Sequence, residues 1–173
     1  MKRNILITLV MILISLPAFS QKYAYIDSEY ILGNVPEYKE AKAELDRIAA
    51  IWQKEIEAKF KSIDSLYKSF QVEAITLPEN LKKNREDMII AAEQDAKNLQ
   101  KKRFGKDGDL FKKREELVKP IQDKVFSAIE EYAKEKGYAF VFDVSGSMTI
   151  VYADNKFDIN DAILEKLGIT PTK

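Results

Sequence analysis

Three side chains with oxygen atoms stand at alternate positions near the end of the chain: Asp143, Ser145 and Ser147. They follow the apolar run of residues 138–142, and Gly146 separates the two serines. Carboxylate and hydroxyl oxygens are the ligands that hard cations such as Mg²⁺ and Ca²⁺ prefer. This stretch therefore raises the hypothesis of a divalent-cation site at the end of a strand.

The pattern resembles the Asp-x-Ser-x-Ser loop by which von Willebrand A domains hold a cation. That resemblance implies a loop after the first strand of a doubly wound sheet, with further ligands on loops much later in the chain. Only 26 residues follow Ser147, too few for the crossover helices that such a sheet requires. The runs 138–144 and 148–152 can instead pair directly around Gly146. We therefore predict a β-hairpin here and no metal site.

The remaining sequence offers little for catalysis. It contains no histidine and no cysteine, which removes the commonest general base and the thiol nucleophile. It also lacks a glycine-rich phosphate loop and a helical glutamate–histidine metal pair. Most carboxylates alternate with lysines, as they do on solvated helix faces. We predict that the protein is not an enzyme and uses no cofactor.

The first twenty residues have the pattern of a cleavable signal peptide. Lys2 and Arg3 precede an uncharged, largely apolar run at 5–16. Pro17 follows this run, and the small residues Ala18 and Ser20 suit a cleavage site after residue 20. Twelve such residues make about 18 Å of helix, well short of the roughly 30 Å core of a bilayer. Without cysteine, neither lipoprotein acylation nor a disulfide is available. We predict residues 1–20 to be a signal peptide and the mature protein to be exported to the periplasm.

The charge balance argues against nucleic acid as a partner. Without Lys2 and Arg3, the 28 basic residues fall to 26 against 28 acidic ones, a net charge of about −2, whereas phosphate binding needs a basic excess. One local basic run is present, and a solvated helix face is its favoured interpretation. Transient contact with a client or with an anionic membrane surface is the alternative. The run comprises Lys97, Lys101, Lys102, Arg103 and Lys106.

A very long helix is predicted for residues 37–75. This segment has no glycine or proline, and its apolar residues recur at steps of three and four from Ala41 to Phe70. Its length of about 58 Å is too great for a globule of 153 mature residues. The helix must therefore project and pair with another.

A return helix is predicted after a reversal at 76–80. It begins near Glu79, weakens at Gly105 and Gly108, and resumes over 110–136, where Pro120 should kink it. Residues 37–117 should thus form an antiparallel helical-hairpin arm. The two glycines raise the further hypothesis of a flexing joint.

Short strands and a terminal helix bracket this arm. The segment 22–27 and the predicted hairpin 138–152 alternate in the manner of strands, and 161–167 reads as a helix closed by Gly168. We therefore predict an α+β fold in which residues 21–36 and 118–173 form a small β-body that carries the arm.

The order of these segments resembles the Skp/OmpH family of periplasmic chaperones over essentially the whole mature chain. The resemblance rests on "YAYIDSEYIL", "PEYKEAKAELD", "KGYAFVFD" and "FDINDAILEKLG" in that order. It implies a homotrimer of jellyfish shape, in which β-bodies assemble and three arms surround a cavity that shelters unfolded outer-membrane β-barrel proteins. It also implies independence from ATP. The best-known members are markedly basic and this chain is not, so no lipopolysaccharide site is carried over.

An apolar row on a projecting arm suggests a surface for such clients. The alternative is that these side chains form only the internal seam of the hairpin. A second alternative, at the level of function, is an exported coiled-coil scaffold protein of the cell envelope. The predicted client-binding residues are Ile56, Phe60, Ile63, Tyr67, Phe70, Met88 and Ile89.

Overall fold

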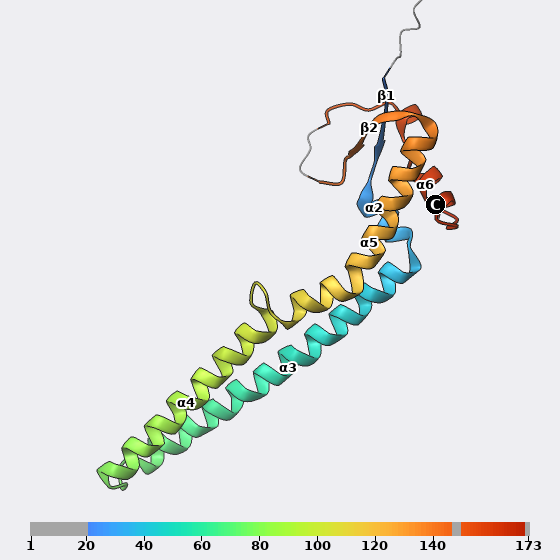
Figure 1. Ribbon diagram of the computed structural model, residues 1–173. Helices are drawn as coiled ribbons and strands as arrows, with labels where there is room; N and C mark the ends of the chain where they lie inside the picture. Colours follow the sequence, from blue (N-terminus) through green and yellow to red (C-terminus); the bar gives the residue numbers. More distant parts are fainter. Residues whose placement is uncertain (1–20, 147–149, 172–173) are drawn as a thin grey trace, which may run out of the picture.

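A long helical hairpin projects from a small body at one end of the molecule (Figure 1). The computed structural model describes residues 21–146 and 150–171, so the predicted signal peptide lies outside the described residues. The elements, in order, are β1 (Lys22–Ile26), α2 (Ser28–Asn34), α3 (Pro36–Glu73), α4 (Glu79–Phe104), α5 (Asp109–Lys136), β2 (Tyr138–Asp143), a 3₁₀ turn (Asn155–Phe157) and α6 (Asn160–Lys166). The predicted α+β class, with a body and a helical-hairpin arm, is confirmed.

The two helices that lead into the arm start for local reasons. The Asp27 side chain accepts a hydrogen bond from the Tyr30 amide at 3.0 Å and so caps α2. Pro36 occupies the first turn of α3, where its missing N–H costs nothing. From there α3 runs for 38 residues to Glu73 without an interruption.

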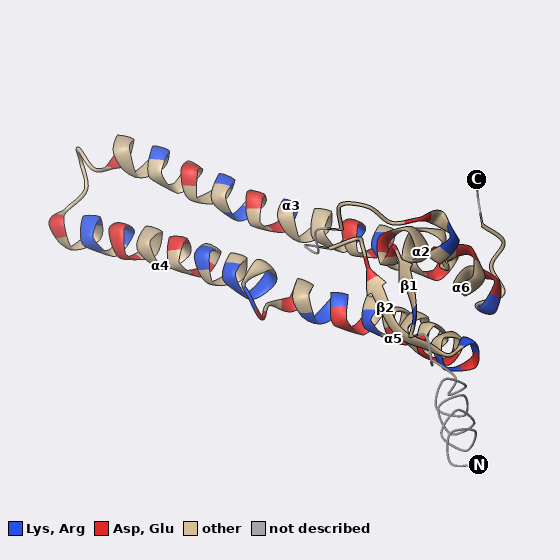
Figure 2. Cartoon of the chain, turned by 90° about the horizontal axis from the view of Figure 1, so that it is seen from above, with Lys and Arg blue, Asp and Glu red and all other residues tan. Residues whose placement is uncertain are grey.

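The arm pairs α3 with α4 and then with the first part of α5 (Figure 1). Basic and acidic residues are distributed along its helices (Figure 2), and many form ion pairs one turn apart, such as Lys68 with Asp64. Exposed pairs of this kind contribute little to stability, roughly 0.3–0.5 kcal/mol each. The apolar seam between the helices therefore has to hold the arm together.

The predicted interruption of the return helix is confirmed at residues 105–108, between α4 and α5. α5 continues through Pro120 without ending, and it bends on its way from the arm to the body (Figure 1). A proline inside a helix cannot donate to the carbonyl one turn earlier, and a bend is the usual result.

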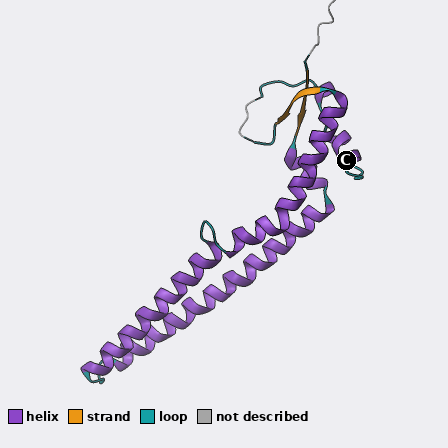
Figure 3. Ribbon diagram, viewed as in Figure 1, coloured by secondary structure: helices purple, strands orange, loops and turns teal. Residues whose placement is uncertain are grey.

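The predicted β-hairpin around residues 145–147 is wrong. β2 pairs instead with β1, in parallel, with Tyr23 opposite Phe140 and Tyr25 opposite Phe142 (Figure 3). Residues 150–152 are not a strand, and residues 147–149 lie outside the described part.

The path of the chain explains the parallel pairing. β1 leads toward the arm, α5 returns from it, and the chain reverses at Gly137, whose φ of 71° is left-handed. β2 therefore runs in the same direction as β1, and the whole arm serves as their crossover connection. No local sequence pattern could reveal this.

The core of the body joins the two ends of the chain. Ile31 of α2, Val125 of α5, and Ile163 and Leu164 of α6 are fully or almost fully buried together with residues of β1. Each such side chain contributes roughly 1.5–3 kcal/mol by burial. A second cluster, of Ala41, Leu45 and Val118, continues this packing into the base of the arm.

Candidate functional site

The seven predicted client-binding residues fall into two groups. Ile56, Ile63 and Ile89 are buried, with exposed fractions of 3%, 6% and 4%, in the part of the arm where its helices pair. Phe60, Tyr67 and Met88 are exposed, at 40%, 41% and 55%. Phe70 is partly buried. The seam alternative thus describes the isoleucines, and the exposed side chains are the ones that a partner could reach.

Helix geometry explains this division on α3. Ile56 and Ile63 are seven residues apart and lie on one line facing α4, whereas Phe60 and Tyr67 follow each of them by four residues and lie on the flank. The sequence stripe therefore contains a seam and a row beside it.

The Tyr67 side chain is fixed in position although its ring is exposed. Its hydroxyl donates a hydrogen bond to the Glu93 carboxylate of α4 at 2.8 Å. This hydrogen bond, with burial as a second cause, raises the pKa of Tyr67 above its ordinary value. The ring is therefore held against the arm as a neutral, flat apolar surface.

Near the tip of the arm the helices leave a small gap. It is lined by Leu66, Ser69, Phe70, Glu73, Arg85, Met88 and Ile89, and its volume is about 20 Å³. Such a volume has room for about one water molecule. Any apolar ligand would have to lie on this surface and not inside it.

Further exposed apolar side chains of the arm were not among the predicted client-binding residues. Val72 and Ile75, beside the turn at the tip, are exposed at 76% and 86%. The signal for these two residues was apolar character outside the periodic stripe, which ends at Phe70. The set comprises Ile51, Val72, Ile75, Leu81, Ile90, Phe104 and Phe111.

The body also has an apolar surface, over its two strands. The rings of Tyr23, Phe140 and Phe142 stack with centroids 6.1–6.4 Å apart. A cavity of about 400 Å³ lies between these strands and the segment 150–157. Tyr152, in that segment, is largely exposed to solvent. A surface of this kind usually marks an interface.

Asp143, the first residue of the suspected cation loop, is used inside the protein. One of its oxygens, Oδ1, accepts hydrogen bonds from the Ser28 amide at 3.1 Å and from the Ser145 amide and hydroxyl at 3.0 and 2.8 Å. Burial raises the pKa of Asp143, but these hydrogen bonds outweigh it and hold the pKa below its ordinary value. The carboxylate thus ties the end of β2 to the start of α2.

The third residue of that loop, Ser147, lies outside the described residues. Within 21–146 and 150–171, no three acidic, histidine or cysteine side chains are grouped in a way that could hold a metal ion.

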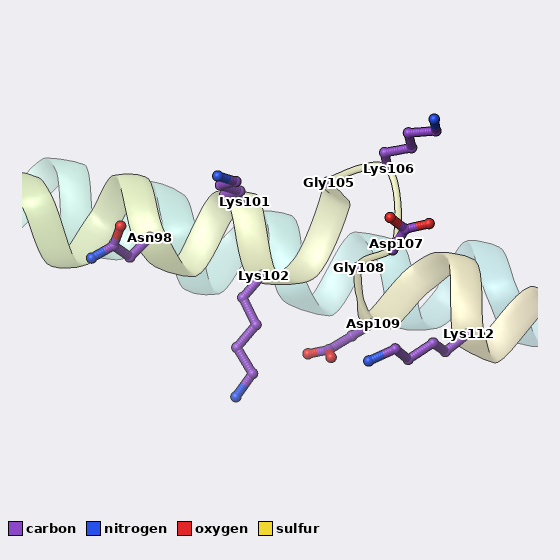
Figure 4. A pocket seen from close by; sticks show the side chains of 9 residues that line it. All are labelled: Asn98, Lys101, Lys102, Gly105, Lys106, Asp107, Gly108, Asp109 and Lys112. Carbon is purple, nitrogen blue, oxygen red and sulfur yellow. The ribbon is translucent and has the colours of Figure 1, made fainter.

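The basic run lies around the interruption between α4 and α5. Lys101, Lys102, Lys106 and Lys112 line an open hollow there, together with Asp107 and Asp109. Their ammonium groups point in different directions and do not converge on one point (Figure 4). Arg103 is engaged in ion pairs with Glu55 and Asp109. No helix in the described part of the chain is long and apolar enough to cross a membrane.

The chain belongs to the family described as Outer membrane protein (OmpH-like), which it matches over residues 22–167. An uncharacterised protein of Aquifex aeolicus (strain VF5) is 30% identical over 158 residues, which cover 91% of this chain and 93% of that protein. A crystal structure of a candidate OmpH-like outer membrane chaperone from Caulobacter crescentus CB15 has the same fold. Its TM-score is 0.67 at 14% identity, over 91% of this chain and 90% of that one. The predicted resemblance to the Skp/OmpH family is thus confirmed.

Proposed function

We propose that the protein is an ATP-independent holdase of the periplasm, which binds unfolded outer-membrane β-barrel proteins and prevents their aggregation. The observation that carries this proposal is the projecting arm, whose exposed apolar side chains no part of the described chain covers. Family membership and the fold shared with a candidate chaperone support a chaperone role in general. The signal-peptide pattern of residues 1–20 supports the location.

The exposed residues of the arm suit weak and unselective binding. An unfolded barrel strand presents apolar side chains at alternate positions and unpaired backbone groups. Full burial of one apolar side chain contributes only roughly 1.5–3 kcal/mol, and ordering an unfolded segment costs about 1–2 kcal/mol per residue. Many loose contacts that leave the client disordered are therefore more favourable than one ordered site. Phe60, Tyr67 and Met88 are the predicted residues best placed for them.

We further propose that three chains assemble through their bodies. The stacked rings over β1 and β2 and the exposed segment 150–152 supply an apolar interface, and three arms would then enclose a cavity. In this arrangement residues 21–36 and 118–173 form the trimerisation body and 37–117 the arm. The basic run around Lys102 could contact an anionic membrane surface transiently.

Light scattering tests this function directly. A urea-unfolded outer-membrane barrel is diluted into buffer with increasing amounts of the mature protein and no nucleotide. We expect suppression of aggregation that saturates at about one barrel per three chains. A folded, helical protein that gives no suppression would refute the holdase and favour the scaffold alternative.

Two variants compare the arm with the body as the binding surface. Phe60→Ser together with Met88→Ser removes two exposed apolar side chains of the arm, and Phe126→Ser removes one from the body segment of α5, where it is 53% exposed. We expect the arm variant to need several times more protein for the same suppression, and the body variant to act like the wild type. Equal activity of all three proteins would remove the arm from the proposal.

A further inference from the structure

The interruption between α4 and α5 is a tightly packed turn. A Cβ atom at Gly105 would collide with the carbonyl oxygen of Lys101, and one at Gly108 would lie 2.7 Å from the carbonyl oxygen of Lys102. The Gly108 amide donates to the Gly105 carbonyl at 2.9 Å, which closes the turn (Figure 4). This geometry requires glycine at both positions because the backbone approaches itself so closely.

One side chain bridges the three helices that meet there. Arg103, in the last turn of α4, forms ion pairs with Asp109 of α5 at 2.7 Å and with Glu55 of α3 at 3.3 Å. Its guanidinium group also lies 4.6 Å from the centre of the Trp52 ring of α3, within the range of a cation–π contact. Phe104 packs edge-on against the same ring at 6.4 Å.

The position of these charges is favourable at both helix ends. Arg103 stands at the carboxyl end of α4, where the helix dipole is negative, and Asp109 at the amino end of α5, where it is positive. The ion pair between them therefore joins two broken helix ends across the turn. α3 passes opposite the interruption as a continuous helix, so it alone carries the regular structure of the arm past this point.

The arrangement leaves one polar group unsatisfied. The Nε atom of Arg103 is buried and has no hydrogen-bond partner among the described residues. A buried donor without a partner costs free energy that release to water would return. The bridge thus has a built-in cost that favours its opening, set against the contacts that keep it closed.

We propose that residues 103–109 form a latched joint in the arm, with Arg103 as the latch. When Arg103 holds Trp52, Glu55 and Asp109, the end of α4 lies against α3. When these contacts of Arg103 break, the last turn of α4 separates from α3 at the glycine turn and exposes Trp52, while α3 keeps the arm continuous. The joint is a property of the arm itself, whatever the arm binds.

The chain provides its own reporter, because Trp52 is its only tryptophan. The experiment compares the fluorescence of the mature wild type, Arg103→Ala, Arg103→Lys and Arg85→Ala. Arg85 is the matched control because it pairs with Glu73 at 3.4 Å near the tip, far from Trp52 in the sequence, so the same charge is lost elsewhere in the arm. Hydrogen exchange measured by mass spectrometry supplies the second readout.

We expect Arg103→Ala to shift the Trp52 emission to longer wavelength and to make it more accessible to acrylamide. Amide exchange over residues 99–112 should become roughly tenfold faster, with the exchange over 80–95 unchanged. Lysine keeps the charge but lacks the flat guanidinium group, so Arg103→Lys should fall between. Arg85→Ala should match the wild type in Trp52 emission and in exchange over 99–112.

Two results would overturn the latch. One is an Arg103→Ala protein whose Trp52 emission and local exchange equal those of the wild type. The other is faster exchange along the whole arm, which would mean general loosening and no joint. If Arg103→Ala does not fold, Asp109→Asn serves instead, since it removes the shorter of the two ion pairs of Arg103 and leaves Arg103 in place. Unchanged exchange over 99–112 in that variant would equally refute the latch.

Discussion

Two neighbouring residues of α4 test the division of the arm into a seam and a surface. Ile89 is 4% exposed and Met88 is 55% exposed, although both were predicted to bind clients. Ile89→Ala removes buried atoms from the seam, and such changes cost 2–5 kcal/mol in protein cores. Only two helices surround this site and they can close on the gap, so we expect the lower end, about 2 kcal/mol.

The same change at Met88 should have almost no effect on stability. Its side chain lies mostly in solvent, and alanine is at least as favourable in a helix as methionine, so we expect less than about 0.5 kcal/mol. In thermal unfolding followed by circular dichroism, a loss of about 2 kcal/mol corresponds to roughly 4–8 °C for a chain of this size.

The melting temperatures of the two variants decide between a buried and an exposed position. Ile89→Ala should melt several degrees below the wild type, and Met88→Ala within about one degree of it. Equal melting temperatures of the two variants, or a lower one for Met88→Ala, would show that the seam of the arm is not where the structure has it.

Three further changes test other parts of the molecule. Gly137→Ala places a side chain at a φ of 71° and should lower the free energy of unfolding in urea by about 1–2 kcal/mol. The control Gly33→Ala, inside a helix with open space around it, should be neutral or slightly stabilising. Equal losses of stability in the two variants would contradict the left-handed conformation at Gly137. Folding lowers the pKa of Asp143 from 3.8. The contribution of this carboxylate to folding stability is therefore present above about pH 4 and is lost as pH falls through the lower pKa of the folded state. The difference in melting temperature between wild type and Asp143→Asn should accordingly shrink from pH 7 to pH 3. A difference that grows in acid would contradict the hydrogen bonds at Asp143. Phe140→Glu should reduce the molar mass measured by light scattering after gel filtration, because it puts a charge on the proposed body interface, and Phe111→Glu on the arm should not; an unchanged mass for Phe140→Glu would exclude this surface from the assembly.

The long helices could be predicted because their signals are local. Apolar spacing defined α3 over almost its full length, and Pro78, the glycines at 105 and 108, and Gly137 marked where the helical segments begin and end. Periodicity and helix-breaking residues act within one or two turns, so a single sequence is enough to recognise them.

Contacts between distant residues could not be predicted in this way. The sequence suggested that β2 would pair with the segment next to it, whereas its partner is β1, more than a hundred residues earlier. A run of alternating apolar residues indicates that a strand is present, but it does not indicate which strand pairs with it. Asp143, at the end of the predicted strand, accepts a hydrogen bond from the Ser28 amide, a contact between residues more than a hundred positions apart that the sequence did not indicate.

The sequence by itself thus determined the lengths of the helices, the place of the reversal and the interruption, and the presence of an apolar row on the arm. The tertiary structure decided which members of that row face the partner helix, as Ile63 does, and which remain exposed, as Tyr67 does. It also decided that Arg103, read in the sequence as part of a solvated basic run, bridges three helices. The physical reason is that periodicity fixes the direction of a side chain around its own helix axis, whereas burial and ion pairing depend on what another segment places opposite it.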